Sequence, residues 1–293
     1  MASLREIKDR IGSVRSTLKI TSAMKLVASA KLRKAQRAIE ALRPYERTLA
    51  EIYNLTNPAA AEASPSGNIG AANTAATAVV AIASNSSLCG GFNANVVRKA
   101  LETIRGCEGA VEVYPLGRKM TEALRRAGYT ADQDYNDLVG HPSYEQSAAL
   151  ARRLAERYER GEIARVVLVY TSFVSASRQE PVAETYLPFS ASFAGSADRH
   201  SPTPIGESPD EEYLLEPDAA ALAAQLLPQV MLLKFHAAIL DSAAAEQAAR
   251  TLAMQTATDN AEDLLGELTL EYNKGRQQKI TAEILDLLGG AAQ

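Results

Sequence analysis

Apolar positions near the start of the chain recur at alternating spacings of three and four residues, from residue 4 to residue 53. A 3.5-residue repeat of this kind keeps one helix face against a partner helix and winds the pair left-handedly. The pattern therefore predicts a coiled-coil helix over Leu4–Tyr53, in which only Thr21, Lys25 and Glu46 are not apolar. The positions are Leu4, Ile7, Ile11, Val14, Leu18, Thr21, Lys25, Ala28, Leu32, Ala35, Ile39, Leu42, Glu46, Leu49 and Tyr53.

The far end of the chain has a matching pattern, and we predict a second long helix from Asp218 to about Leu288. The spacing recurs at Met254, Ala257, Ala261, Leu264 and Leu268, and continues at Ile280, Ile284, Leu287 and Ala291. Helices of roughly 50 to 70 residues would be ~75 to 105 Å long, longer than a compact domain is wide. The two are therefore expected to pair as an antiparallel shaft, with a kink in the first at Pro44. Two ordinary bundle helices are the alternative.

Between the helices, strand and helix patterns alternate after a linker of low complexity. The predicted elements are strands at Ala78–Ala83, Val111–Leu116 and Arg165–Ser172, an edge strand at Thr185–Ser192, and helices at Asn93–Ile104, Arg118–Ala127 and Ser143–Arg160. This alternation predicts a mostly parallel sheet covered on both faces. Residues Gly195–Asp210, with three prolines, are expected to be a mobile loop.

The fold class is therefore α/β: a long antiparallel coiled coil of the N- and C-terminal helices, with a Rossmann-like three-layer α/β/α domain inserted between them. The expected boundaries are 1–57 for the N-terminal helix, 58–77 for the linker, 78–215 for the α/β domain and 216–293 for the C-terminal helix.

Composition narrows the class of protein. Cys89 and Cys107 are the only cysteines and neither belongs to a CxxC pair, which argues against a disulfide framework or a thiolate zinc site and fits a reducing compartment. The first ten residues carry charges where a signal peptide needs an apolar run. The richest apolar tract, Leu226–Leu240, is interrupted by Pro228, Lys234 and other polar residues, so no membrane-spanning helix is expected.

Charge is distributed unevenly along the chain. The first 37 residues hold ten basic and two acidic residues, a net +8, whereas the whole chain carries −4. A basic helix of this kind can bind nucleic acid, face acidic protein partners, or simply form the solvated face of a helix pair opposite the acidic terminal helix. Charge alone leaves all three open.

The sequence shows no catalytic apparatus. The turn Cys89–Gly91 follows the first strand, but it lacks the GxGxxG spacing, and no GxxxxGK[ST] motif occurs in the chain. His141, His200 and His236 share no metal-like spacing. We therefore expect no catalytic residue, cofactor or metal site and interpret the Gly-Gly turn as structural; a free-standing α/β enzyme is the rival hypothesis.

Several segments together resemble the gamma subunit of F-type ATP synthases. They are KITSAMKLVASAKLRK at residues 19–34, LCGGFN at 88–93, YLLEP at 213–217, and AARTLAMQTATDNA, LEYNKGRQQKITAEI and LLGGAAQ between residue 246 and the C-terminus. The resemblance therefore spans the whole chain.

The resemblance implies a noncatalytic central rotor of a proton-translocating ATP synthase. Both termini would form the shaft inside a ring of alternating alpha and beta subunits, and the α/β domain would form the foot, with the epsilon subunit and the membrane c ring as further partners. It implies no nucleic acid binding and no direct membrane insertion. The location it implies is peripheral, on the cytoplasmic side of the bacterial inner membrane. Dithiol regulation, implied by chloroplast members, is not expected because residues 195–210 contain no cysteine.

The resemblance also implies contact residues at individual positions. For the beta subunit they are Met24, Lys25, Arg250, Arg276, Gln277, Thr281, Glu283 and Asp286. For the c ring and epsilon they are Tyr213, Leu214 and Glu216. Met24 has an equally good interpretation as a seam residue, and residues 213–217 as an edge strand.

The chain departs from the family pattern at three places. Asn85-Ser86-Ser87 replaces Asp-Arg-Gly, Ala245 stands where serine is usual, and Thr251 replaces a common methionine. These changes bear on the polar contacts of the turn near Cys89 and on local packing.

Overall fold

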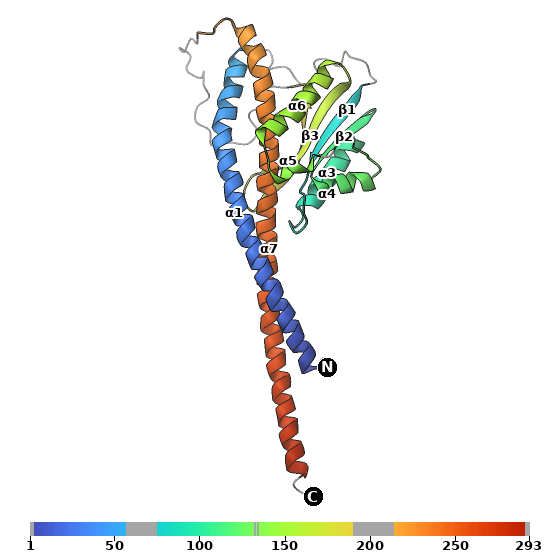
Figure 1. The fold of residues 1–293 in the computed structure, drawn as a ribbon, viewed down its shortest axis with the longest axis vertical. Coiled ribbons are helices and arrows are strands. Elements are labelled where there is room, and N and C mark those ends of the chain that lie inside the picture. The colour runs from blue at the N-terminus through green and yellow to red at the C-terminus, as the bar shows by residue number, and fades with distance from the viewer. Residues whose placement is uncertain (1–2, 57–74, 132, 134, 190–213, 291–293) are drawn as a thin grey trace. The chain divides into compact units, whose positions relative to one another are not determined.

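The computed structural model describes residues 3–56, 75–131, 133, 135–189 and 214–290. Its contacts divide the chain into two compact units. The terminal helix pair consists of residues 1–30 and 250–293, and the sheet unit consists of residues 31–249. Helices α1 (Leu4–Thr56) and α7 (Ala219–Gly290) each contribute a segment to both units (Figure 1).

The two long helices form where the three-four pattern predicts them. All fifteen predicted seam positions of α1 are buried or partly buried, and none is exposed. Within the terminal helix pair, Thr258 contacts Thr21 and Gly275 lies against Leu4, so the two segments run antiparallel. Helix α1 continues through Pro44, and a kink there stays a prediction.

The predicted seam of α7 does not continue to the end of the helix. A Cβ added at Gly275 would lie 3.1 Å from the side chain of Leu4, and Leu4 is the first residue of α1. Beyond this level Ile280 and Ile284 are about half exposed, at 48% and 51%, because the described part of α1 has ended. The expectation that these two residues extend the seam was therefore wrong. Leu287 and Ala291 lie outside the side chains that the structure describes.

The sheet unit contains a four-stranded sheet in the order β2-β1-β3-β4. Strand β1 (Ala76–Ile82) pairs in parallel with β2 (Val111–Leu116) and β3 (Ile163–Phe173), and β4 (Gln179–Leu187) runs antiparallel to β3. The edge strand begins six residues before the predicted Thr185–Ser192 and overlaps it only at residues 185–187, because Gln179 already pairs with Phe173 at the end of β3. The mostly parallel sheet is confirmed.

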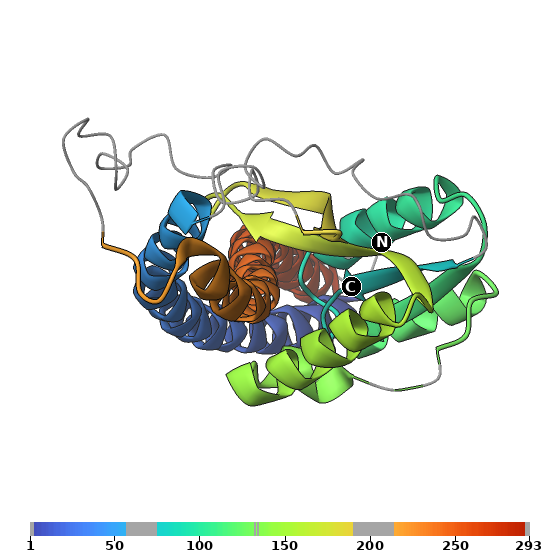
Figure 2. The same ribbon diagram turned by 90° about the horizontal axis from the view of Figure 1, so that it is seen from above.

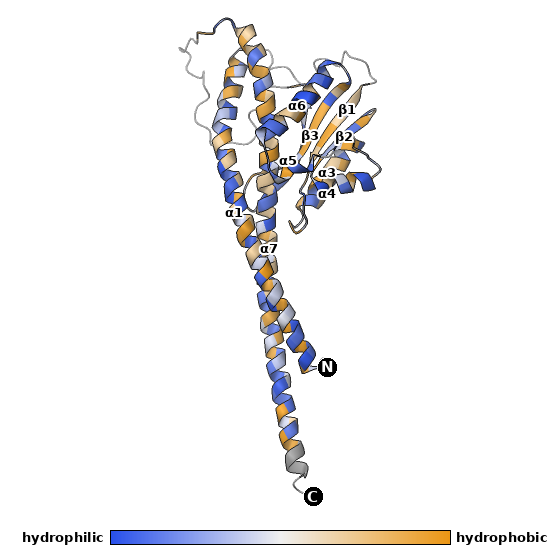
Figure 3. Cartoon of the chain, viewed as in Figure 1, coloured by the Kyte–Doolittle hydropathy of each residue, from blue (hydrophilic) through white to orange (hydrophobic). Residues whose placement is uncertain are grey.

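Both faces of this sheet are covered, as the near-continuous apolar run of β1 requires. Val79 and Ala81 point to the face covered by α3 (Phe92–Arg105) and α4 (Arg118–Arg126). Val80 and Ile82 point to the other face, where α5 (Asn136–Gly140), α6 (Tyr144–Glu159) and part of α7 pack (Figure 2). Figure 3 shows β1 and β3 as largely hydrophobic. The result is three layers, as predicted, with the added helix α5.

The expected linker at 58–77 and the expected loop at 195–210 fall largely or wholly outside the described residues. The four-part division of the chain stays a prediction, and the compact units cut across both long helices.

Helix α7 is long and apolar enough, by composition, to cross a membrane. However, 44% of its most apolar window is buried inside the chain, and Met231, Phe235 and Ile239 belong to the core of the sheet unit. These contacts explain its apolar composition as that of a core helix.

Candidate functional site: exposed end of α7 and polar seam of the helix pair

The last turns of α7 present side chains away from the rest of the helix pair. Arg276, Gln277, Thr281 and Glu283, all predicted contact residues, are exposed. The Thr281 hydroxyl donates to the Gln277 carbonyl oxygen at 2.9 Å, and the side chains of Lys279 and Glu283 lie 3.7 Å apart. These interactions lie within one helix, so the outward-facing surface is open to a partner.

Asp286 lies in the same helix, but its side chain is outside the described ones.

A polar layer interrupts the seam of the terminal helix pair. Thr258 donates to the hydroxyl of Thr21 at 3.0 Å, and both residues are buried. One turn away, the Lys25 ammonium donates to the amide oxygen of Gln255 at 2.8 Å, and that amide donates to Asp259 at 2.6 Å. Lys25 therefore serves the seam, whatever further contact it makes.

Met24 and Arg250, the other two predicted contact residues of this unit, are less accessible than the end of α7. Met24 is partly buried and Arg250 is only 9% exposed. Their role toward a partner stays a prediction, and the burial of Arg250 shows that it also packs within the chain.

Apolar side chains beside this layer are exposed, and the sequence interpretation missed them. Ile20, Leu26 and Val27 of α1 are 60%, 68% and 56% exposed, and Leu252 and Leu270 of α7 are 51% and 73% exposed. Contiguous exposed apolar surface is a feature of interaction sites, and Ile20, Leu26 and Val27 lie within eight residues of one another on α1. These five residues could have been found in the sequence, because they are apolar although they lie between the seam positions.

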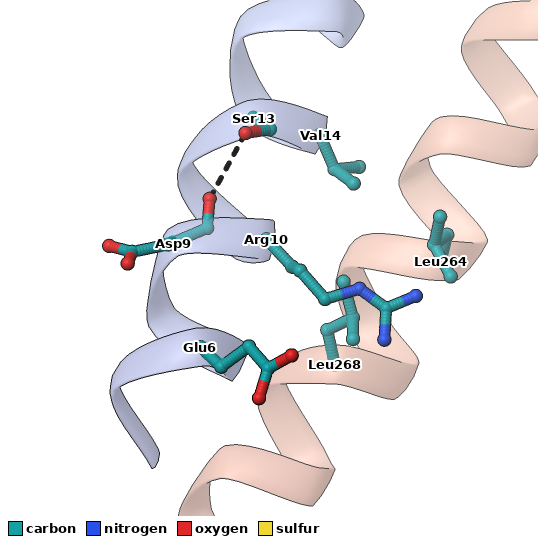
Figure 4. A pocket seen from close by; sticks show the side chains of 7 residues that line it. All are labelled: Glu6, Asp9, Arg10, Ser13, Val14, Leu264 and Leu268. Carbon is teal, nitrogen blue, oxygen red and sulfur yellow. Dashed lines mark hydrogen bonds between the residues drawn. The ribbon is translucent and has the colours of Figure 1, made fainter. Parts of the chain in front are cut away.

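A shallow pocket of about 330 Å³ lies between the two helices of this unit (Figure 4). Val14, Leu264 and Leu268 form its apolar side, whereas Glu6 and Arg10 lie at its polar side. Side-chain groups of at least three His, Cys, Asp or Glu that could hold a metal are absent from the described residues. The pocket thus combines apolar packing surface with charged groups at one side.

The predicted foot residues are only partly described. Leu214 is 87% exposed and Glu216 is exposed, whereas Tyr213 lies outside the described residues. Leu214 and Glu216 precede α7 and do not belong to a strand, which excludes the edge-strand alternative for these two residues.

The turn after β1 packs as a structural element. It lies at the carboxyl end of the strand flanked by both parallel neighbours, where open α/β sheets often bind ligands. Here Cys89 and Phe92 pack against Ala245 of α7. Asn93 accepts a hydrogen bond from the Ser84 N–H at 3.1 Å and donates to the Ser86 carbonyl oxygen at 3.1 Å. These contacts support the structural interpretation of the turn.

Gly117, which follows β2, lies against this turn, and Asn85 belongs to it. Gly117 has φ +95°, and a Cβ there would lie 2.1 Å from the carbonyl oxygen of Ala83, so glycine is required. Asn85 accepts from the Arg118 N–H at 2.9 Å and donates to the Asn136 carbonyl oxygen at 2.8 Å. The residue that departs from the family pattern thus still joins α4 to α5.

Known proteins resemble the chain along its entire length. A family profile described as ATP synthase matches residues 3–293. The ATP synthase gamma chain of Bacteroides thetaiotaomicron is 46% identical over 300 residues, covering 100% of both chains. The chain belongs to the ATP synthase gamma-chain family. The gamma chain of Pelotomaculum thermopropionicum, 38% identical over 100% of this chain and 99% of its own length, agrees.

Solved structures support the fold of this gamma-family chain. A chain of the Euglena gracilis mitochondrial ATP synthase in rotational state 3 matches with a TM-score of 0.65 at 19% identity, over 99% of this chain and 93% of that one. A chain of the central stalk and c ring of the Tetrahymena thermophila enzyme gives 0.56 at 21% identity, over 81% and 99%. The resemblance of the sequence segments to gamma subunits, and the fold it implied, are confirmed.

Proposed function

We propose that this chain is the central rotor shaft of a proton-translocating F-type ATP synthase. As a gamma chain it is a noncatalytic subunit, and the chemistry belongs to the beta subunits of the complex. Its partners are the alpha and beta subunits, the epsilon subunit and the c ring. The observation that carries this proposal is membership in the gamma-chain family over the full length.

The mechanism follows from an asymmetric shaft in a ring of identical sites. Each angle of the shaft presents different side chains to a given beta subunit and so stabilises a different conformation of it. The exposed end of α7 suits this role, because Arg276 and Gln277 offer exposed polar groups on a helix surface where Ile280 and Ile284 are apolar. Such side chains form charge-assisted hydrogen bonds at some angles and release them at others.

We further propose that the complex holds this chain at the cytoplasmic face of the bacterial inner membrane, as a peripheral subunit. The bacterial gamma chains that it resembles support this location. Membrane fractions should contain the chain together with alpha, beta and epsilon subunits. Treatment that removes the ring of alpha and beta subunits from the membrane should release this chain as well. Recovery of the chain free of these subunits at native expression would contradict the proposal.

The contact role of Arg276 and Gln277 is tested by replacing both with alanine. Hydrogen bonds to charged groups contribute about 1.5–3 kcal/mol, enough to change the population of a rotor angle by about tenfold or more. Alanine retains helix propensity, so the variant should assemble normally and lose much of its ATP turnover. The measurements are membrane ATPase rate and proton pumping at matched assembly.

The matched control is Lys274→Ala with Gln278→Ala. These residues are also exposed and lie on the same helix, and their replacement by alanine changes the charge by the same amount. The control should retain both activities. Wild-type rates for the Arg276–Gln277 variant, or an equal loss in the control, would exclude a specific coupling contact.

A further inference from the structure

Five charged side chains gather in the sheet unit, and none of them is a predicted contact residue. Arg43 and Glu46 come from α1, Lys234 and Asp241 from α7, and Glu184 from β4. We call them the charged cluster. It lies where both long helices meet the β3–β4 hairpin.

Hydroxyl groups of β3 tie this cluster to the sheet. Ser172 donates to one carboxylate oxygen of Asp241 at 3.4 Å, and Arg43 lies 3.7 Å from the other. Tyr170, itself only 9% exposed, donates to Glu184 at 3.1 Å. The contacts therefore link α1 to α7, α7 to β3, and β3 to β4.

The charged cluster is held at a cost. Burial raises the pKa of Asp241 to about 6 and also raises the pKa of Glu46. Burial lowers the pKa of Lys234 to about 7, although Glu184 and Glu46 favour its charged form. Apolar residues of similar size often stabilise a fold better than buried ions do, so stability alone does not explain the cluster.

We propose that the charged cluster is a proton-responsive joint, which fastens the β3–β4 hairpin to α1 and α7 through its hydrogen bonds and ion pair and whose hold on the hairpin changes with its protonation. With Lys234 protonated, a cation stands among the carboxylates of Glu46 and Glu184. Because the cost of burial outweighs the attraction of those two carboxylates, loss of this proton relieves the cluster of a desolvated charge. The proton count of the cluster thus sets how firmly the hairpin is held.

The direction of the pH dependence follows from proton binding in the folded and unfolded chain. Between about pH 7 and 10.5 the unfolded chain holds the Lys234 proton and the folded chain does not, so global stability rises with pH. Between pH 3.8 and about 6 the folded chain holds the Asp241 proton, so stability falls as pH rises. Glu46 acts in the same direction as Asp241. Arg43, Glu184 and Tyr170 also face these groups. The opposite slopes of Lys234 and of the two carboxyl groups predict the lowest stability between about pH 6 and 7.

A titration of the lysine side chains by NMR tests the joint directly in the full wild-type chain. One lysine should titrate near pH 7, more than two pH units below the ordinary value of ~10.4, and its signal should be missing in Lys234→Met. A titration in which every lysine changes above about pH 9 would overturn the proposal, and this experiment does not depend on the stability of any variant.

Unfolding by denaturant at pH 5 to 9 gives a second test. Above pH 7 the wild-type unfolding constant should fall by up to about tenfold for each unit by which the pH rises, because only the unfolded chain holds the Lys234 proton. This part of the profile should be absent in Lys234→Met. Asp241→Asn should remove most of the change below pH 6. Glu180→Gln, an exposed ion-pair variant on the same hairpin, should keep the wild-type profile.

The protection of the amides in residues 179–187 against hydrogen exchange, relative to the intrinsic exchange rate at each pH, should follow the same pH profile in the wild type. Parallel pH profiles in wild type and Lys234→Met, by either measurement, would contradict a proton-responsive joint. All of these measurements use the chain without its partners, so their outcome is independent of the rotary function proposed above.

Discussion

The sheet unit and the terminal helix pair use apolar residues in opposite ways. In the sheet unit, Val79, Val80 and Leu116 have no exposed surface, and the sheet lies between two layers of helices. In the terminal helix pair, Leu26 and Leu270 are more than two-thirds exposed, and the seam includes small and polar residues. A two-helix unit has only one buried stripe per helix, so its remaining apolar side chains are available to partners.

This comparison predicts that the same substitution has different costs in the two regions. Leu168→Ala, at a fully packed position of β3, should lower the free energy of unfolding by about 2–5 kcal/mol. Leu264→Ala, at a position 40% exposed in the helix pair, should cost about 1–2 kcal/mol, because less apolar surface leaves water there. Denaturant unfolding followed by circular dichroism measures both, and equal costs would break the comparison.

The polar layer of the helix pair should show a smaller and coupled effect. Thr258→Val removes the hydroxyl that donates to Thr21 and should cost about 0.5–1.5 kcal/mol. The double variant Thr21→Val with Thr258→Val removes both partners of that bond and should recover part of the loss. The measurement is a double-mutant cycle of unfolding free energies. Strict additivity would mean that the two hydroxyls do not stabilise each other.

The smallest effect on stability is expected at the exposed apolar surface. Leu270→Ser should change the unfolding free energy by less than about 0.5 kcal/mol, because the side chain is 73% exposed. It should also reduce binding of a hydrophobic dye to the isolated chain. Leu268→Ser, two residues away and 4% exposed, is the matched control and should be clearly destabilising. A large loss at Leu270 would show that this surface already packs within the chain.

Much of the fold could be predicted because its signals are local or periodic. Strand β2 has the predicted bounds, Val111–Leu116, and the long seam of α1 is confirmed position by position. The edge strand β4 was misplaced because its polar residues and Pro181 weaken the strand pattern, and because pairing with β3 defines it more than its own sequence does. Helix α5 is only five residues long and leaves no periodic signal.

The charged cluster could not be predicted, because its members come from three elements that are far apart in the sequence and only packing brings them together. Lys234 gave a partial signal, since it interrupts an apolar tract. The exposure of Arg276 and Gln277 was expected for contact residues, but it depended on where α1 begins opposite α7. The partner contacts themselves stay predictions.

The division of the terminal helix pair between the two ends of the chain has a consequence for synthesis on the ribosome. Residues 1–30 emerge first but cannot pair until residues beyond 250 are made, a delay on the order of 10 to 40 s at ~5–20 residues per second. During that time the apolar stripe of the nascent first helix, including Ile7 and Ala28, lacks its cover. The net charge of +8 over the first 37 residues makes nascent copies on neighbouring ribosomes repel one another until the last helix is synthesised.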